Sequence, residues 1–224
     1  MIAKPTIPEP SRDCPLCPRL AAFRTENRAV YPEFHNAPVP SFGPADARLL
    51  IVGLGPGLKG ANRTGRPFTG DYAGDLLYRT LLEFGLAAGR YDRRPDDGLE
   101  LLACRVTNAV RCVPPENKPM PAEVRTCGTF LAAEIRGLGN LAAILALGRI
   151  AHDAVLMALG CRLSEFRFGH GAVHDLPNGL RLIDSYHCSR YNTQTGVLTE
   201  PMFREAVAAA RRSVEPDATV TGRR

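Results

Sequence analysis

The amino-acid sequence predicts a single α/β domain built on a doubly wound, mostly parallel sheet of about four strands. Short apolar segments alternate along the chain with longer segments whose apolar residues recur at helical spacing. The chain has 224 residues, and 45% of them are hydrophobic, so it is large enough to bury one extended core.

Four apolar segments are the predicted strands, and the loops that follow them are expected at one edge of the sheet, where α/β proteins bind ligands. The strands are residues 48–52, 99–106, 141–147 and 180–184, and the helices are 72–84, 122–138, 149–159 and 198–212. The last strand is the second arm of a hairpin predicted over 166–184, because Pro177, Asn178 and Gly179 are a turn signal. A further short helix is predicted to begin at Asp13, a candidate N-cap.

Composition narrows the class of protein without identifying it. The net charge of +5 permits nucleic-acid binding but does not indicate it. The N-terminus lacks the apolar segment of a signal peptide, and nothing approaches the roughly 18 apolar residues of a membrane span. We therefore expect a cytoplasmic monomer whose seven cysteines do not form disulfides. Residues 1–12 are expected to be a flexible lead, 13–212 the domain, and 213–224 a disordered tail.

A glycine-rich stretch, residues 53–71 (GLGPGLKGANRTGRPFTGD), separates the first strand from the first long helix. Its glycines would let the backbone approach a ligand closely. Residues 55–60 satisfy the dinucleotide pattern GxGxxG, but Asn62, Gly65 and Pro67 exclude a helix at this point. A Walker phosphate loop is excluded as well, because its lysine must be followed by serine or threonine and here a glycine follows.

The stretch resembles, over its whole length, motif one of the family-five uracil-DNA glycosylases, which are iron–sulfur DNA-repair enzymes of bacteria and archaea. Its most specific part is residues 60–71, GANRTGRPFTGD. The resemblance implies an α/β/α sandwich that excises uracil, and other deaminated bases such as hypoxanthine, from double-stranded DNA in the nucleoid of a prokaryote. Because no lysine is among the candidate catalytic residues, we expect a monofunctional enzyme without Schiff-base strand cleavage.

Four of the seven cysteines form a pattern. Cys14 and Cys17 are a CxxC pair, and Cys112 and Cys127 follow much later in the chain. Four thiolates in a reducing compartment can hold zinc or an iron–sulfur cluster. Residues 111–119, RCVPPENKP, resemble the second cysteine motif of the family, and the resemblance implies a 4Fe–4S cluster on these four cysteines. The remaining cysteines, Cys104, Cys161 and Cys188, are expected to be structural rather than nucleophilic.

The candidate catalytic residues come from three loops. His187 leads residues 187–196, HCSRYNTQTG, which resemble motif two of the family. Breaking an N-glycosidic bond expels the base as an anion, and a positioned histidine can stabilise the charge that grows on it. Asp71 matches the aspartate that ends motif one and could polarise water or stabilise the sugar cation, and it could also cap the following helix. Asn117 matches another polar position of the family.

Residues of the first two loops are expected to hold a base flipped out of the duplex. Phe68 is expected to stack on that base, although a plain core role is open, and Asn108 could hydrogen-bond its edge. The other candidate substrate-binding residues are Gly55, Pro56 and Gly57. The candidate DNA contacts, which are mostly phosphate contacts, are Arg63, Arg66, Lys118, Ser189, Arg190 and Asn192.

The pattern of glycines bears on which bases are accepted. Gly57 and Gly60 stand where other glycosylase families carry a tyrosine and a glutamate, so a pocket wide enough for hypoxanthine is expected. Asn108 could instead favour uracil through its N3 and O4 edge. We therefore expect uracil to be the first substrate and hypoxanthine a weaker one.

Two other functions are open. A uracil-restricted family-four enzyme would carry acidic residues in motif one, where this chain has Leu54, Gly60 and Ala61. A metal-bearing nucleic-acid-binding module without catalysis would use the cysteines and arginines but leave His187 and Asp71 unexplained.

Overall fold

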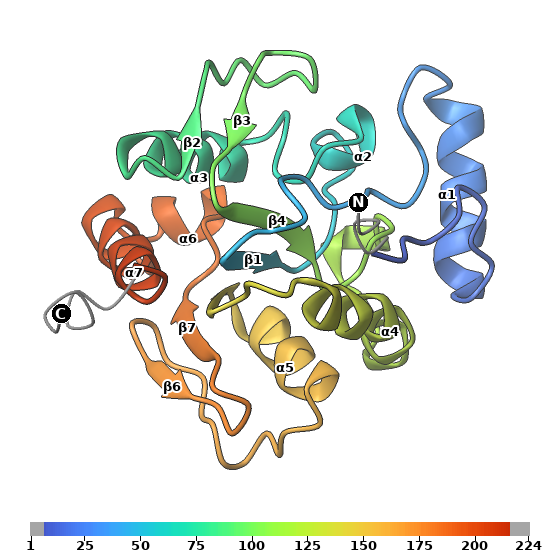
Figure 1. Cartoon of the computed structure of the whole chain (residues 1–224). Helices are drawn as coiled ribbons and strands as arrows, with labels where there is room; N and C mark the ends of the chain where they lie inside the picture. The colour runs from blue at the N-terminus through green and yellow to red at the C-terminus, as the bar shows by residue number, and fades with distance from the viewer. Residues whose placement is uncertain (1–6, 216–224) are drawn as a thin grey trace, which may run out of the picture.

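The apolar strands lie side by side in one sheet, in the order β4-β1-β5-β7-β6 (Figure 1). Four of them, β1 (Leu49–Gly53), β4 (Cys104–Asn108), β5 (Ala143–Leu147) and β7 (Arg181–Ser185), are parallel, as the sequence predicts. The fifth, β6 (Val173–Asp175), is the first arm of the predicted hairpin and pairs antiparallel with β7. The computed structural model describes residues 7–215.

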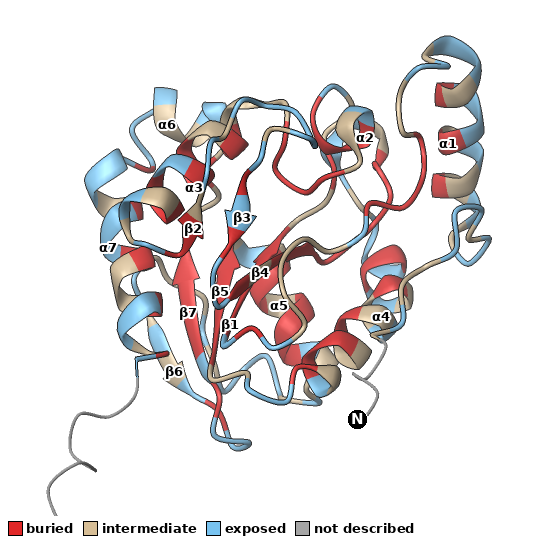
Figure 2. Cartoon of the chain, turned by 45° about the horizontal axis from the view of Figure 1, so that its top comes forward, coloured by how far each residue is buried: buried red, intermediate tan, exposed pale blue. Residues whose placement is uncertain are grey.

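Helices cover both faces of this sheet because both faces of its strands are apolar. Alternate residues of β1 show this: Leu49 and Ile51 belong to one cluster of the core, and Leu50 and Val52 to the other. The first cluster is closed by α3 (Tyr72–Glu83) and α7 (Glu200–Arg212). The second is closed by α4 (Pro121–Gly137) and α5 (Arg149–Ala158), with α1 (Pro18–Val30) beside them. In Figure 2 the four parallel strands are mostly buried, while β6 and the outer faces of the helices are largely exposed.

Two predictions about local structure were wrong. The segment 99–106 is not one strand, because Ala103 has a φ of 54° and breaks it. Its first part is β3 (Glu100–Leu101), which pairs with β2 (Ala87–Ala88) in a separate small sheet, and only its second part joins the main sheet as β4. The glycine-rich stretch also contains one helical turn, α2 (Ala61–Thr64), where the sequence was expected to exclude one.

The N-terminal part also differs from the prediction. The first helix begins at Pro18, with Cys17 and not Asp13 as its N-cap, because proline fits the first helical position. The described part of the expected lead is anchored: Glu9 lies 3.1 Å from the guanidinium of the buried Arg111. Residues 1–6 and 216–224, on which the rest of the expected lead and tail falls, lie outside the described residues. No helix within residues 7–215 is long and apolar enough to cross a membrane.

The carboxyl ends of the parallel strands meet at one edge, where the chain passes from β1 outward to β4 and then returns to β5 on the other side of β1. Such a reversal of strand order opens a crevice between the loops that follow the two strands. The glycine-rich stretch follows β1 into this crevice, Asn108 ends β4, and His187 lies just beyond β7. The fold therefore brings the predicted motifs together.

Two short helices complete this edge. α6 (Arg190–Gln194) follows His187, and the single turn η1 (Pro115–Asn117) follows β4. Both begin within the segments that resemble the family motifs. They carry most of the exposed polar side chains around the crevice.

Candidate active site

Two connected cavities occupy the crevice. The inner one, called the base pocket here, has a volume of about 250 Å³ and is lined by Gly55, Gly57, Ala61, Phe68, Asp71, Ala73, Asn108 and His187. It opens into a wider cleft of about 1320 Å³, called the outer cleft, whose lining adds Leu54, Lys59, Gly70, Tyr72, Asn117, Ser189 and Arg190. All three candidate catalytic residues therefore line this one concavity. Pro56 is buried and lines neither cavity.

Phe68 is held in the base pocket at a cost in backbone energy. Its φ of 51° is unusual for a residue with a bulky side chain. The hydroxyl of Tyr91 donates to the carbonyl of Phe68 (3.3 Å), and that of Tyr78 donates to the carbonyl of Pro67 (2.5 Å). These bonds fix the turn that aims the Phe68 ring into the pocket. Gly53 is required beneath this ring, since a Cβ there would approach its atoms within 2.6 Å.

Asp71 combines the two roles that the sequence left open. One carboxylate oxygen accepts the backbone N–H of Gly74 (3.2 Å) and caps α3. The second, Oδ2, faces Gly57 and Gly60 at the wall of the pocket, where added Cβ atoms would lie 3.1 Å and 2.2 Å from it. Burial raises the pKa of Asp71 above its usual value of 3.8, and the helix N–H groups oppose that rise. A carboxylate is thus held against the pocket by a helix end.

The position of the Asp71 carboxylate explains why residue 60 is a glycine. A side chain at position 60 would collide with Asp71, because its Cβ would lie 2.2 Å from Oδ2. A Cβ on Gly57 would lie 3.1 Å from the same oxygen, which is also a tight contact. Both glycines therefore make space for the acid.

The imidazole of His187 faces Phe68 across the base pocket, with ring centroids 5.9 Å apart and an interplanar angle of 26°. Burial lowers the pKa of His187 to about 4, and no charged or hydrogen-bonding group within the described chain opposes that shift. The ring is therefore neutral near pH 7 and can present one N–H to a ligand. The planes of the two rings are therefore nearly parallel.

The segment after His187 has structural roles as well as exposed groups. The Ser189 hydroxyl caps α6 by accepting the N–H of Asn192, and the Asn192 amide donates to the carbonyl of His187 (2.8 Å). Arg190 is exposed, and its guanidinium lies 5.7 Å from the centroid of the Tyr72 ring. Ser189 and Arg190 line the outer cleft, and Asn192 lines a neighbouring cavity together with Leu54 and His187.

Arg66 does not fit its predicted role. Its guanidinium is buried and makes a bidentate ion pair with Asp97, at 2.9 Å and 2.8 Å. It also lies 5.0 Å from the Phe42 ring centroid, and its Nε donates to Thr69. This arginine fastens the glycine-rich stretch to the loop around Asp97 and cannot reach a phosphate. Arg63 and Lys118 are exposed, so their predicted contacts stay open.

Four thiols meet at a second place, as the sequence predicts. Cys14, Cys17, Cys112 and Cys127 all line a cavity of about 320 Å³ between α1, α4 and the loop after β4. Arg24 points into it, with Nη1 3.5 Å from the Cys112 sulfur, and its buried Nε has no partner in the described chain. The backbone N–H of Arg111 donates to the Cys127 sulfur (3.3 Å).

The donor set at this cavity suits a metal group. Four thiols can ligate one zinc ion or the irons of an iron–sulfur cluster. Two N–H donors lie beside the sulfurs, the Arg24 guanidinium at Cys112 and the Arg111 backbone at Cys127, and hydrogen bonds of this kind are found around cluster sulfurs.

Several lining residues carried no signal in the sequence. Leu54, Ala61 and Ala73 enter the site only through the fold, and Lys59, which lines the outer cleft, was not expected there. Cys188 is fully buried and its sulfur lies 3.5 Å from the Ala73 carbonyl; burial raises the pKa of its thiol. Cys104 is buried too, in agreement with its predicted structural role.

Comparisons with known proteins agree with this geometry. A type-5 uracil-DNA glycosylase of Thermus thermophilus is 48% identical over 89% of this chain and 93% of its own length. One of Pyrobaculum aerophilum is 37% identical over 88% of each chain. A type-4 uracil-DNA glycosylase of Thermotoga maritima is 35% identical over 66% of this chain and 67% of its own. Residues 40–211, which hold the whole candidate site, match the family described as the uracil DNA glycosylase superfamily, and the chain belongs to that superfamily.

Proposed function

We propose that this protein is a monofunctional uracil-DNA glycosylase of base excision repair, which acts as a monomer on deaminated bases in double-stranded DNA. One observation carries the proposal: a neutral imidazole, an aromatic ring and a half-buried carboxylate line a single pocket. The names of its relatives supply the substrate class. A base cannot reach such a pocket from within the duplex, so the nucleotide is flipped out first.

The chemistry follows from the positions of these groups. The flipped uracil stacks on Phe68, and the neutral His187 donates a hydrogen bond to the pyrimidine O2 as the glycosidic bond breaks and negative charge grows there. The free oxygen of Asp71 stabilises the positive sugar and polarises the attacking water. Asn117, at the mouth of the outer cleft, is placed to bind near the sugar, and Ser189, Arg190 and Asn192 hold the strand.

A histidine with a low pKa suits this role. A cationic imidazolium would require a neighbouring anion to keep its charge in a buried pocket, whereas a neutral ring needs none. The neutral ring stays a hydrogen-bond donor throughout the pH range in which DNA is stable. The departing base therefore leaves as an anion stabilised by a hydrogen bond rather than by full proton transfer.

The proposal is tested by base release from a duplex with one uracil. The wild-type protein should release uracil and leave an intact abasic strand, and His187→Ala should slow single-turnover excision about a hundredfold to a thousandfold, the usual cost of losing one preorganised donor. Affinity for undamaged duplex should stay within about twofold. A wild-type protein that binds DNA without releasing uracil would favour the non-catalytic alternative. Strand cleavage without added alkali would point to Lys59.

Asp71→Asn separates helix capping from chemistry. Asparagine caps helices as well as aspartate does, so the melting temperature should hardly change, while excision should fall about a hundredfold because the charge is gone. The wild-type rate should decline as acid protonates Asp71, at a higher pH than for an ordinary aspartate because burial raises its pKa, and this acid limb should be absent in Asp71→Asn. Asp71→Ala, which also removes the cap, is the control for stability. An Asn variant with the wild-type rate and acid limb would restrict Asp71 to capping.

The cysteine cavity is proposed to hold a 4Fe–4S cluster ligated by Cys14, Cys17, Cys112 and Cys127. The four thiols and the two N–H groups beside them support a metal group here, and the resemblance of residues 111–119 to the second cysteine motif of the family favours a cluster over zinc. The cluster would join the start of α1 to α4 and to the loop after β4, segments that are far apart in the sequence. Its contribution is to crosslink these segments, and no step of base release uses it.

Replacing any of the four ligand cysteines with alanine should remove the broad absorption near roughly 400 nm that thiolate-bound iron gives. Replacing Cys104, Cys161 or Cys188 should preserve it, since these lie away from the cavity. Iron and zinc analysis of protein purified without oxygen measures the metal directly. A colourless protein that holds one tightly bound zinc would contradict the cluster.

Asn108 is proposed to set the preference among bases. Its buried amide lines the base pocket at the end of β4 and can pair with the N3 and O4 edge of uracil. Hypoxanthine carries an equivalent pair, O6 and N1–H, on a larger two-ring base that shifts this edge relative to Asn108. Asn108→Ala should therefore slow uracil release by about fivefold to a hundredfold, the value of a buried hydrogen bond, and leave hypoxanthine release nearly unchanged. Single-turnover rates on both bases in matched duplexes measure this. An unchanged ratio would exclude Asn108 from recognition, and the absence of any hypoxanthine release would favour a uracil-restricted enzyme.

A further inference from the structure

The ring of His187 lacks a partner that would orient it. Burial is the only cause that shifts its pKa, so no described charged or hydrogen-bonding group acts on the ring. Histidines that act on substrates are usually oriented by a hydrogen bond to the second ring nitrogen. Here the orientation depends on the backbone at residues 186–188 and on the Phe68 ring. The groups that fix the backbone at residues 186–188 therefore determine the direction of the N–H of the His187 ring.

On its C-terminal side, this backbone is held by the Asn192 amide, which donates to the carbonyl of His187. On its N-terminal side it is held by His170. The backbone N–H of Tyr186 donates to Nδ1 of His170 (3.1 Å), and the two rings stack with centroids 5.1 Å apart. Nδ1 of His170 must carry no hydrogen in order to accept this bond. Burial lowers the pKa of His170, which favours the neutral ring that this requires.

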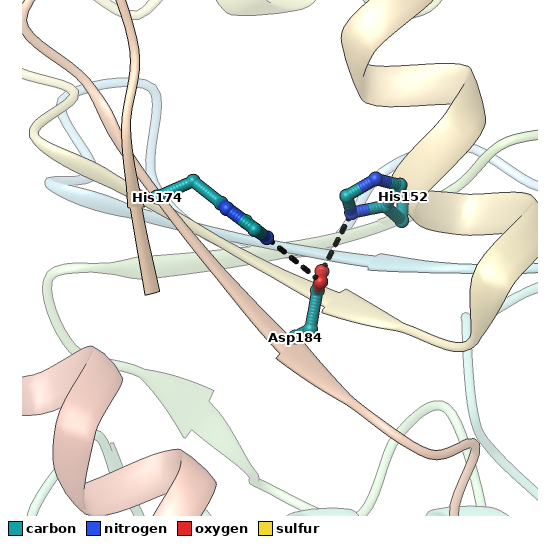
Figure 3. A group of neighbouring side chains, drawn as sticks. All are labelled: His152, His174 and Asp184. Carbon is teal, nitrogen blue, oxygen red and sulfur yellow. Dashed lines mark hydrogen bonds and ion pairs between the residues drawn. The ribbon is translucent and has the colours of Figure 1, made fainter. Parts of the chain in front are cut away.

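The segment that carries His170 is itself anchored by a buried cluster of three side chains, shown in Figure 3. Asp184 of β7 accepts Nδ1 of His152 from α5 (2.8 Å) and Nε2 of His174 from β6 (3.2 Å). The same carboxylate also accepts the backbone N–H of Gly169, the neighbour of His170 (3.3 Å). The cluster therefore fixes residues 169–174 along the end of β7.

The cluster is a closed hydrogen-bond network rather than an open cation site. Its donor atoms lie within 4.8 Å of one another, but each already has a partner. His152 faces acceptors on both sides, the Asp184 carboxylate and the carbonyl of Phe166 (2.9 Å), so both of its ring nitrogens carry hydrogen. Burial opposes this charge, but Asp184 raises the pKa of His152 above its usual value. A buried ion pair thus tethers the segment to α5.

We propose that His170 is a positioning residue for His187, acting through the hydrogen bond from Tyr186 N–H and held in place by the His152–Asp184–His174 cluster. The bond from Tyr186 N–H fixes the backbone on the N-terminal side of His187. The bond from the Asn192 amide fixes the backbone on its C-terminal side. The inference rests on the proposed glycosylase function, since it concerns the aim of the group that stabilises the departing base.

Two substitutions separate the acceptor from the ring. His170→Phe keeps an aromatic ring against Tyr186 but removes the acceptor, whereas Oδ1 in His170→Asn occupies nearly the same place as Nδ1 and can still accept. His170→Phe should lower single-turnover uracil excision by about tenfold to a hundredfold, the range expected when a catalytic group is misplaced. His170→Asn should stay within about threefold of wild type. Affinity for undamaged duplex should change in neither. Val173→Ala, an exposed position on the same segment, is the matched control.

A double-mutant cycle provides the decisive measurement. In a His187→Ala background, His170→Phe should cost less than about twofold, because there is no longer a ring to aim. An equal loss in both backgrounds, an equal loss for Phe and Asn, or a wild-type rate for His170→Phe would each overturn the proposal. A variant that merely unfolds is recognised by its thermal melt, and the Asn comparison still decides. A wild-type protein without excision would overturn the glycosylase function first, so the two failures are distinguishable.

Discussion

The carboxylate of Asp71 is the group on which the geometry of the active site depends. One of its oxygens completes the N-terminus of α3, and the other lies against the backbone of Gly57 and Gly60. A helix cap fixes the position of a side chain more firmly than a surface contact does, because the helix itself is packed into the core through residues such as Leu77. The glycine-rich stretch has to bend around this fixed oxygen. The lack of side chains at Gly57 and Gly60 is thus a consequence of the position of the Asp71 carboxylate.

The same stretch is fixed at a second point by buried polar groups rather than by apolar packing. Arg66 is neutralised by Asp97 and surrounded by aromatic rings, while Tyr78 and Tyr91 bind the carbonyls of Pro67 and Phe68. A buried ion pair contributes little net stability, but breaking one is costly, so it favours a single loop conformation. That conformation includes the strained φ of Phe68. The strain places an aromatic ring opposite His187, so that both rings line the base pocket.

The sequence predicted the parallel strands, the helices that cover them and the edge at which the site lies, because apolar periodicity reports burial directly. The cysteine pattern by itself indicated a site for zinc or an iron–sulfur cluster, and the resemblance favoured the cluster. Prediction from the sequence failed with Arg66, since an arginine in a glycine-rich loop looks the same in sequence whether it meets a phosphate or a carboxylate thirty-one residues away. It also treated Gly60 as an opening, because the position of the Asp71 oxygen is a fact of three-dimensional structure. Local patterns identify elements, whereas the partner of a polar group depends on tertiary contacts.

The two histidines near this edge of the sheet, His152 and His187, have different surroundings, and the difference explains their separate roles. His152 lies against Asp184, whose carboxylate raises the pKa of the imidazole against the opposing effect of burial and ties α5 to β7. His187 is only a few residues further along the chain from Asp184, yet it faces an aromatic ring and no anion, so burial leaves it neutral. A cation at His187 would need a counter-charge, and Asp71 would be the nearest candidate in the pocket lining. Such a pair would neutralise both groups. In the proposed mechanism, a neutral imidazole leaves the Asp71 carboxylate free to stabilise the sugar and the His187 N–H free to bind the base.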